Sequence, residues 1–198
     1  MGRLEQIRHR ALALIKDEHR SLAAVVHALQ YLAARMEKGD KPDSTLLGAI
    51  THYLLQFPEK LHHPAEERFL FDPLRARTKE AREVLDKLTA EHAAGAEREA
   101  KLLAALNALA VGTAEAVAGF RRAVEEYANF YWAHMMTEET LILPLAERML
   151  DETEWTAAFE GFAANHDPMY GPDTANQFDA LFHRIVHMAP SPIGLGGR

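Results

Sequence analysis

The sequence predicts an all-α protein: an antiparallel four-helix bundle followed by one or two extra C-terminal helices. Strong helix formers dominate the 198 residues, and clusters of turn residues are few. Along most of the chain, apolar residues recur at spacings of three and four, the period of a helix that is buried on one face. Four long periodic segments joined by short turns favour antiparallel neighbours. We therefore place the bundle in residues 1–150 and a helical extension with an irregular tail in residues 151–198.

The first two predicted helices are delimited by glycine and proline. The first covers about residues 4–38 and stops at the Gly39–Pro42 segment. The second begins after that segment and continues to about residue 71. We expect Pro58 and Pro64 to kink it, because a proline removes an amide donor and crowds the carbonyl four residues before it.

The third and fourth predicted helices meet at a glycine. The third covers about residues 79–109 and ends near Gly112, and Thr113 is a suitable N-cap for the fourth, at about residues 114–150. The fourth gives the strongest periodic signal of the chain. One of its faces carries Phe120, Val124, Tyr127, Tyr131, His134, Glu138, Leu141 and Leu145.

The C-terminal extension contains two weaker helical signals. A short helix is predicted at about residues 152–164, and a last one at about residues 174–186, beyond a breaker at residues 167–172. Residues 190–198 are rich in proline and glycine, so we expect an irregular tail there.

Composition excludes several classes of protein. The chain has no Cys, which rules out disulfides and thiolate metal sites. Its 22 Lys+Arg face 29 Asp+Glu, for a net charge of -7, and its basic residues are not clustered, which argues against a nucleic-acid partner. The most apolar stretch, residues 102–120, is interrupted by polar residues and falls short of the ~18 apolar residues of a membrane span.

The start of the sequence lacks the apolar core of a signal peptide. We therefore expect a cytoplasmic protein without a membrane partner. An oligomer is compatible with the sequence, but no clear interface predicts one.

A repeated motif carries the chemistry. His-x-x-x-Glu-Glu occurs at His62 with Glu66, and again at His134 with Glu138. Residues four apart share a helical face, and a single such pair is usually only an exposed ion pair. Here both copies lie on apolar stripes, where unpaired carboxylates and imidazoles would cost several kcal/mol each. The repeat therefore indicates that a cation compensates buried side chains.

Three further histidines extend this set, and two of them lie on the remaining helices. His19 lies on the inner stripe of the first helix, and His92 follows the apolar positions of the third. His63 lies about 100° around the helix from His62, an angle that lets neighbours bind two adjacent metals. The candidate metal ligands are therefore His19, His62, His63, Glu66, His92, His134 and Glu138. Nitrogen and carboxylate ligands without thiolate suit iron, manganese or zinc, and iron is our first choice.

Some neighbouring residues have two readings. Glu18 and Glu91, each just before a candidate ligand, either accept ring N–H bonds from histidines or are exposed. The aromatic residues Tyr127, Tyr131 and Trp132 either line or cover the pocket or belong to the plain core. His27 is rotated away from His19, so we expect it not to bind metal directly.

These motifs resemble those of the hemerythrin-like proteins, also called HHE cation-binding domains, over about residues 7–148. The resemblance rests on Asp17-Glu18-His19, His62-His63-Pro64-Ala65-Glu66-Glu67, Glu91-His92, His134-Met135-Met136-Thr137-Glu138-Glu139 and Leu143-Pro144. It implies an oxo- or hydroxo-bridged centre of two iron ions. By this resemblance Glu66 and Glu138 bridge the irons, with His19 and His62 on one and His63, His92 and His134 on the other. One iron is then short of a ligand, and in the oxygen carriers dioxygen takes that position.

One departure from the family pattern bears on function. The classical oxygen carriers have two histidines four apart on the third helix, whereas here Ala96 stands four residues after His92. Either His63 or a water fills this place. Reversible oxygen transport therefore does not carry over directly.

Three functions follow as hypotheses. The first is a non-haem di-iron protein that binds dioxygen, nitric oxide or peroxide at an incompletely coordinated iron, for sensing, storage or protection. The second is a di-iron enzyme that handles peroxide or nitric oxide, or supplies iron for cluster repair. The third is a zinc-binding or metal-free helical interaction module. The sequence shows no separate acid, base or nucleophilic triad, so it leaves enzymatic activity undecided.

Overall fold

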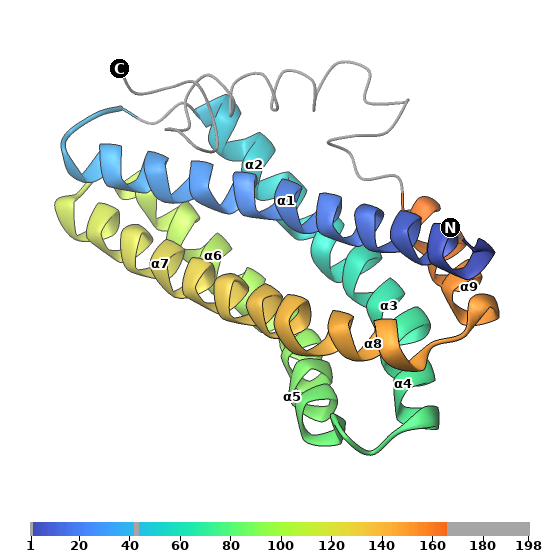
Figure 1. Ribbon diagram of the computed structural model, residues 1–198. Helices are drawn as coiled ribbons and strands as arrows, with labels where there is room; N and C mark the ends of the chain where they lie inside the picture. Colours follow the sequence, from blue (N-terminus) through green and yellow to red (C-terminus); the bar gives the residue numbers. More distant parts are fainter. Residues whose placement is uncertain (1, 42–43, 166–198) are drawn as a thin grey trace.

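The computed structural model describes residues 2–41 and 44–165, and nearly all of these residues are helical (Figure 1). No strand occurs in these two ranges, which confirms the all-α class. The predicted helix at residues 174–186 and the predicted tail at residues 190–198 lie outside the described residues.

The helical elements follow one another with very short connections. The α-helices are α1 (Arg3–Glu37), α2 (Ser44–Phe57), α3 (His63–Glu66), α4 (Asp72–Arg77), α5 (Arg82–Ala93), α6 (Gly95–Ala108), α7 (Ala114–Thr137), α8 (Leu143–Met149) and α9 (Glu152–Ala163). Wider π-helical turns join some of them, namely η1 (Pro58–His62), η2 (Glu67–Phe71) and η4 (Glu138–Ile142), and a 3₁₀ turn, η3 (Leu109–Val111), follows α6.

Helix ends agree with the predicted signals at Gly39 and Thr113, whereas two predicted helices differ from the structure. Gly39, at φ 95°, follows α1, and the Thr113 hydroxyl accepts a hydrogen bond from the Ala116 amide at the start of α7. The second helix was predicted to end at about residue 71, but it continues through α4 to Arg77. The predicted helix at residues 79–109 is instead divided into α5 and α6 by a turn at Ala94. The break comes just before Gly95, because glycine is a weak helix former.

Each of the three π turns ends two residues before a proline: Pro64, Pro73 and Pro144. A proline ring collides with the carbonyl four residues before it, and widening the preceding turn relieves the collision. The amide of His63 accordingly donates to the Pro58 carbonyl, five residues back, as do the equivalent amides after η2 and η4. These prolines therefore widen the turns that carry or adjoin the repeated motif.

In η4, the third π turn, one residue that was predicted to be in the core is exposed. Leu141 is placed by helical spacing on the inner face, but it is 51% exposed, whereas Ile142 is fully buried. The wide turn adds a residue, so the buried face shifts by one position along the chain.

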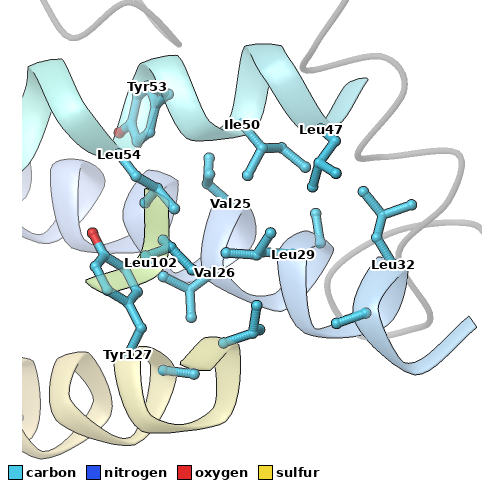
Figure 2. Packing of buried hydrophobic residues seen from close by; sticks show 14 of the residues in the cluster. Val25, Val26, Leu29, Leu32, Leu47, Ile50, Tyr53, Leu54, Leu102 and Tyr127 are labelled. Atoms are coloured by element: carbon cyan, nitrogen blue, oxygen red, sulfur yellow. The ribbon is translucent and has the colours of Figure 1, made fainter. Parts of the chain in front are cut away.

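Apolar side chains form two core clusters. Helix α1 packs against α2, α7 and α9, and α6 packs on α7. In the first cluster α1, α2, α6 and α7 meet, and Figure 2 shows Val26, Ile50 and Leu102 among its members. The second cluster gathers the other end of α1 with α3, α4, α5, α8 and α9, and includes Ile15 and Trp155. Along α1, His19 lies between Ile15 of the second cluster and residues of the first.

Among the described helices, none has the length and apolarity that crossing a membrane requires.

Candidate metal centre

All seven predicted ligands lie together at the junction between the two core clusters. Six of them are buried, and the side chain of His92 is only 7% exposed. His19 comes from α1, His92 from α5 and His134 from α7, while the others come from the η1–α3 segment and the start of η4. The sequence folds these positions inward because they continue the apolar stripes of their helices.

Two carboxylates occupy the middle of this group. One oxygen of Glu66 is 3.5 Å from His19 Nε2 and 3.3 Å from His62 Nε2, and its other oxygen is 3.6 Å from His92 Nε2. Glu138 presents one oxygen to His19 Nε2 at 3.5 Å and the other to His134 Nε2 at 3.1 Å. The two oxygens of each carboxylate therefore face different histidines.

The donor atoms form two sets, each within 4.8 Å and able to hold a metal ion. The first set is His19, His62 and Glu66, and the second is His63, Glu66, His92 and His134. Glu66 belongs to both sets. The His/Glu cluster could thus bind two ions side by side that share a carboxylate.

Every one of the five histidines has a glutamate on its outer ring nitrogen. The Nδ1–carboxylate distances are 2.9 Å for His19–Glu139, 2.7 Å for His62–Glu18, 3.1 Å for His63–Glu59, 2.9 Å for His92–Glu67 and 2.9 Å for His134–Glu91. A carboxylate at Nδ1 accepts its proton, which leaves the Nε2 lone pair directed at the centre. This arrangement fixes the tautomer that a metal ligand needs.

Of the two readings given for Glu18 and Glu91, the structure shows the contact with a histidine ring. The other three of the five glutamates were not predicted in this role. Glu67 and Glu139 are the second glutamates of the two His-x-x-x-Glu-Glu motifs, and each serves a histidine on another helix. Glu59 precedes His63 by one helical turn. The second glutamate of each motif was the feature of the sequence that could have predicted the roles of Glu67 and Glu139.

The outer carboxylates are themselves anchored. Glu67 accepts hydrogen bonds from the Thr89 hydroxyl at 2.6 Å and from Arg75 at 3.3 Å. Glu18 accepts from the side chain of Asn165, which follows α9. The rings are therefore held from behind by more than one layer of hydrogen bonds.

When the histidine rings are neutral, the inner atoms, by contrast, lack donors. Within the described residues, both oxygens of Glu66 and of Glu138 and the Nε2 atoms of His19 and His63 are buried without a hydrogen-bond partner. The Nε2 atoms of His92 and His134 lie 3.0 Å apart, yet both are acceptors when their Nδ1 atoms carry the protons. Buried acceptors without donors are costly, and a cation would satisfy them together. Nitrogen and oxygen donors of this kind fit iron, manganese or zinc.

Charge within the centre shifts several pKa values. Burial opposes ionisation of Glu66, but His62 and His19 outweigh it and hold its pKa well below the ordinary value. Burial lowers the pKa of His63 to about 4, despite its contact with Glu59. Burial also opposes protonation of His134, but the adjacent Glu138 carboxylate raises its pKa to about 9. Without metal, protonated histidines thus balance the two central carboxylates near neutral pH.

Metal uptake is expected to release protons. A metal must displace the proton from His134, whose pKa of about 9 lies above neutral pH, and from His62, whose pKa is also raised. Between pH 6 and 8 the affinity for Zn²⁺ should rise about tenfold per pH unit for each proton released. Calorimetric titration in buffers of different ionisation enthalpy counts these protons. Binding without proton release would contradict the protonation states assigned here.

Other predicted residues belong to neither donor set. The ring of His27 packs on Trp132, with centroids 4.5 Å apart, and belongs to neither set. Tyr131 is buried in the first core cluster, whereas Trp132 is half-buried. A cleft of about 460 Å³ behind His19 is lined by His19, Arg20, Ala23, Trp132, Met135, Met136, Glu139 and Thr140.

Fold and site together define an all-helical protein with a buried His/Glu cluster able to hold metal. The chain belongs to the hemerythrin HHE cation-binding domain family, whose model matches residues 10–146. All seven predicted ligands fall within the matched range, and α9 follows it. Comparisons with curated proteins and with solved structures find no match.

Proposed function

We propose that the chain is a non-haem di-iron protein that binds dioxygen, nitric oxide or peroxide at an incompletely coordinated iron, and that it acts in sensing, storage or protection. The observation that carries this proposal is the placement of Glu66 and Glu138, whose oxygens each face histidines on both sides. A carboxylate placed in this way can bridge two ions.

The side chains would divide unequally between the two ions. His19 and His62 serve the first position, and His63, His92 and His134 serve the second, with Glu66 and Glu138 shared. The first position thus has one nitrogen fewer, and this is where a small ligand would bind. Two iron ions, when bound, would supply the electrons that dioxygen accepts.

The surroundings suit such a centre. The buried rings exclude water, and the five outer glutamates hold each Nε2 atom in place before a metal arrives. The arrangement proposed for the bundle is an antiparallel set of four: α1, the α2–α4 segment, the α5–α6 segment and the α7–α8 segment. The packing of α1 on α7 and of α6 on α7 supports it.

The proposal is tested by the optical spectrum and the metal content of protein prepared with iron under anaerobic conditions and then exposed to air. We expect two irons per chain and a near-ultraviolet and visible charge-transfer band that appears with oxygen. If the band fades when oxygen is removed, binding is reversible. A band that persists indicates oxidation, as a sensor or an enzyme would show. Protein that takes up zinc alone, with no band, contradicts the proposal.

A further inference from the structure

We propose that Glu59, held between Tyr131 and Gly95, is the positioning residue that makes His63 a metal ligand. The inference deepens the proposed function, because it rests on the second of the two metal positions assigned above. It assigns roles to three residues from three different elements, η1, α6 and α7. None of the three is itself a ligand.

Glu59 uses both carboxylate oxygens. Its Oε2 accepts from His63 Nδ1 at 3.1 Å, and its Oε1 accepts from the Tyr131 hydroxyl at 3.1 Å. Its side chain is only 13% exposed, and Tyr131 is fully buried. With both oxygens engaged, the carboxylate has one orientation, and it fixes the ring of His63 in turn.

Gly95 provides the space for this carboxylate. A Cβ atom on Gly95 would overlap the Oε2 and Cδ atoms of Glu59. Any side chain at this position would therefore displace the Glu59 carboxylate. Because the displaced group is the end of a flexible side chain, the backbone can stay where it is. The break between α5 and α6 thus coincides with a contact that only glycine allows.

The ring of His63 lies where the second metal position needs a third histidine nitrogen. It lies parallel to the ring of His92, with centroids 4.1 Å apart and planes 13° apart, and its Nε2 is buried without a hydrogen-bond partner. The third helical segment supplies only His92, since Ala96 stands one turn further on. His63 therefore supplies the nitrogen that α6 lacks, and Glu59 decides whether it points inward.

The contact between Glu59 and His63 should affect only the second of the two metal positions. His19 and His62 are held by Glu139 and Glu18, which make no contact with Glu59 among the hydrogen bonds described above. Loss of the Glu59 contact should weaken the second metal position and leave the first one intact. A residue that serves only the fold would weaken both positions together.

Competitive titration with Zn²⁺ and a chromophoric chelator tests the proposal, using the full chain freed of metal. The wild-type protein is expected to bind two Zn²⁺ ions in two resolved steps. In Gly95→Ala and Glu59→Ala the step that fills the second position, the one with three histidines, should weaken by about 10–100-fold, while the other step stays within about threefold. Tyr131→Phe should show a smaller loss in the same step, and Glu59→Gln should restore part of the affinity, because its amide oxygen still accepts from His63.

Gly48→Ala is the matched control. Gly48 lies within α2, and a Cβ there meets nothing within 4 Å. It should bind both ions as the wild type does. Thermal unfolding of the metal-free variants shows whether the fold is retained.

Two results would overturn the positioning role: unchanged binding at the three-histidine position in Gly95→Ala and Glu59→Ala, or equal weakening of both steps. A wild-type chain that binds a single Zn²⁺ would instead contradict the two-position site on which the inference rests.

Discussion

Replacing Glu66 with alanine is expected to empty both metal positions at once. Its two oxygens face different histidine groups, at 3.3–3.5 Å on one side and 3.6 Å on the other. A side chain that serves both ions cannot be removed from one alone. Iron content measured after loading and desalting should fall from about two ions per chain toward zero, since losing a shared carboxylate removes a ligand from each position.

His27→Ala is the control for this change. His27 lies two turns from His19 on α1, but its ring contacts Trp132 and not the central carboxylates. Its removal should leave the iron content unchanged. If Glu66→Ala retained one tightly bound ion, Glu66 would belong to a single position. If His27→Ala also emptied the site, the ligand set would be wrong.

Replacing Trp155 with alanine is expected to lower the free energy of unfolding by about 3–5 kcal/mol, the usual cost of removing a large buried aromatic side chain. Trp155 is fully buried in the second core cluster and comes from α9, which follows the family-matched residues and packs along α1. Urea unfolding of the metal-free protein, followed by circular dichroism, measures the change.

The exposed neighbour Thr153 gives the control for α9. Thr153→Ala removes a side chain from the same helix without opening the core, and should change stability by less than about 0.5 kcal/mol. A Trp155→Ala variant as stable as the wild type would show that the bundle folds without α9. That outcome would favour the predicted domain boundary at residue 150. A large loss of stability would instead show that α9 unfolds together with the bundle as one cooperative unit.

The sequence predicted the helical class because periodicity, helix formers and turn residues agree along the chain. It also placed the breaks near Gly39 and Gly112. It could not predict the register after a widened turn, since a period of 3.6 assumes an unbroken helix. Leu141 is exposed for that reason. In hindsight, the recurring proline two residues after each π turn carries this information.

The inner residues of the site were easier to predict than the outer ones. His62, Glu66, His134 and Glu138 form repeated i,i+4 pairs, which a helix places on one face. The carboxylates behind the rings mostly reach across from other helices, as Glu67 does to His92, and such pairs depend on packing that spacing does not encode. The contact between Glu59 and Gly95 also joins different elements, so only the structure shows it.

The most direct test of a two-metal centre is a crystal structure of the iron-loaded protein, with anomalous diffraction measured at the iron edge. We predict two anomalous peaks within one chain, one beside His19 and His62 and the other beside His63, His92 and His134, with Glu66 touching both. A single peak, or two peaks that share no carboxylate, would contradict this account.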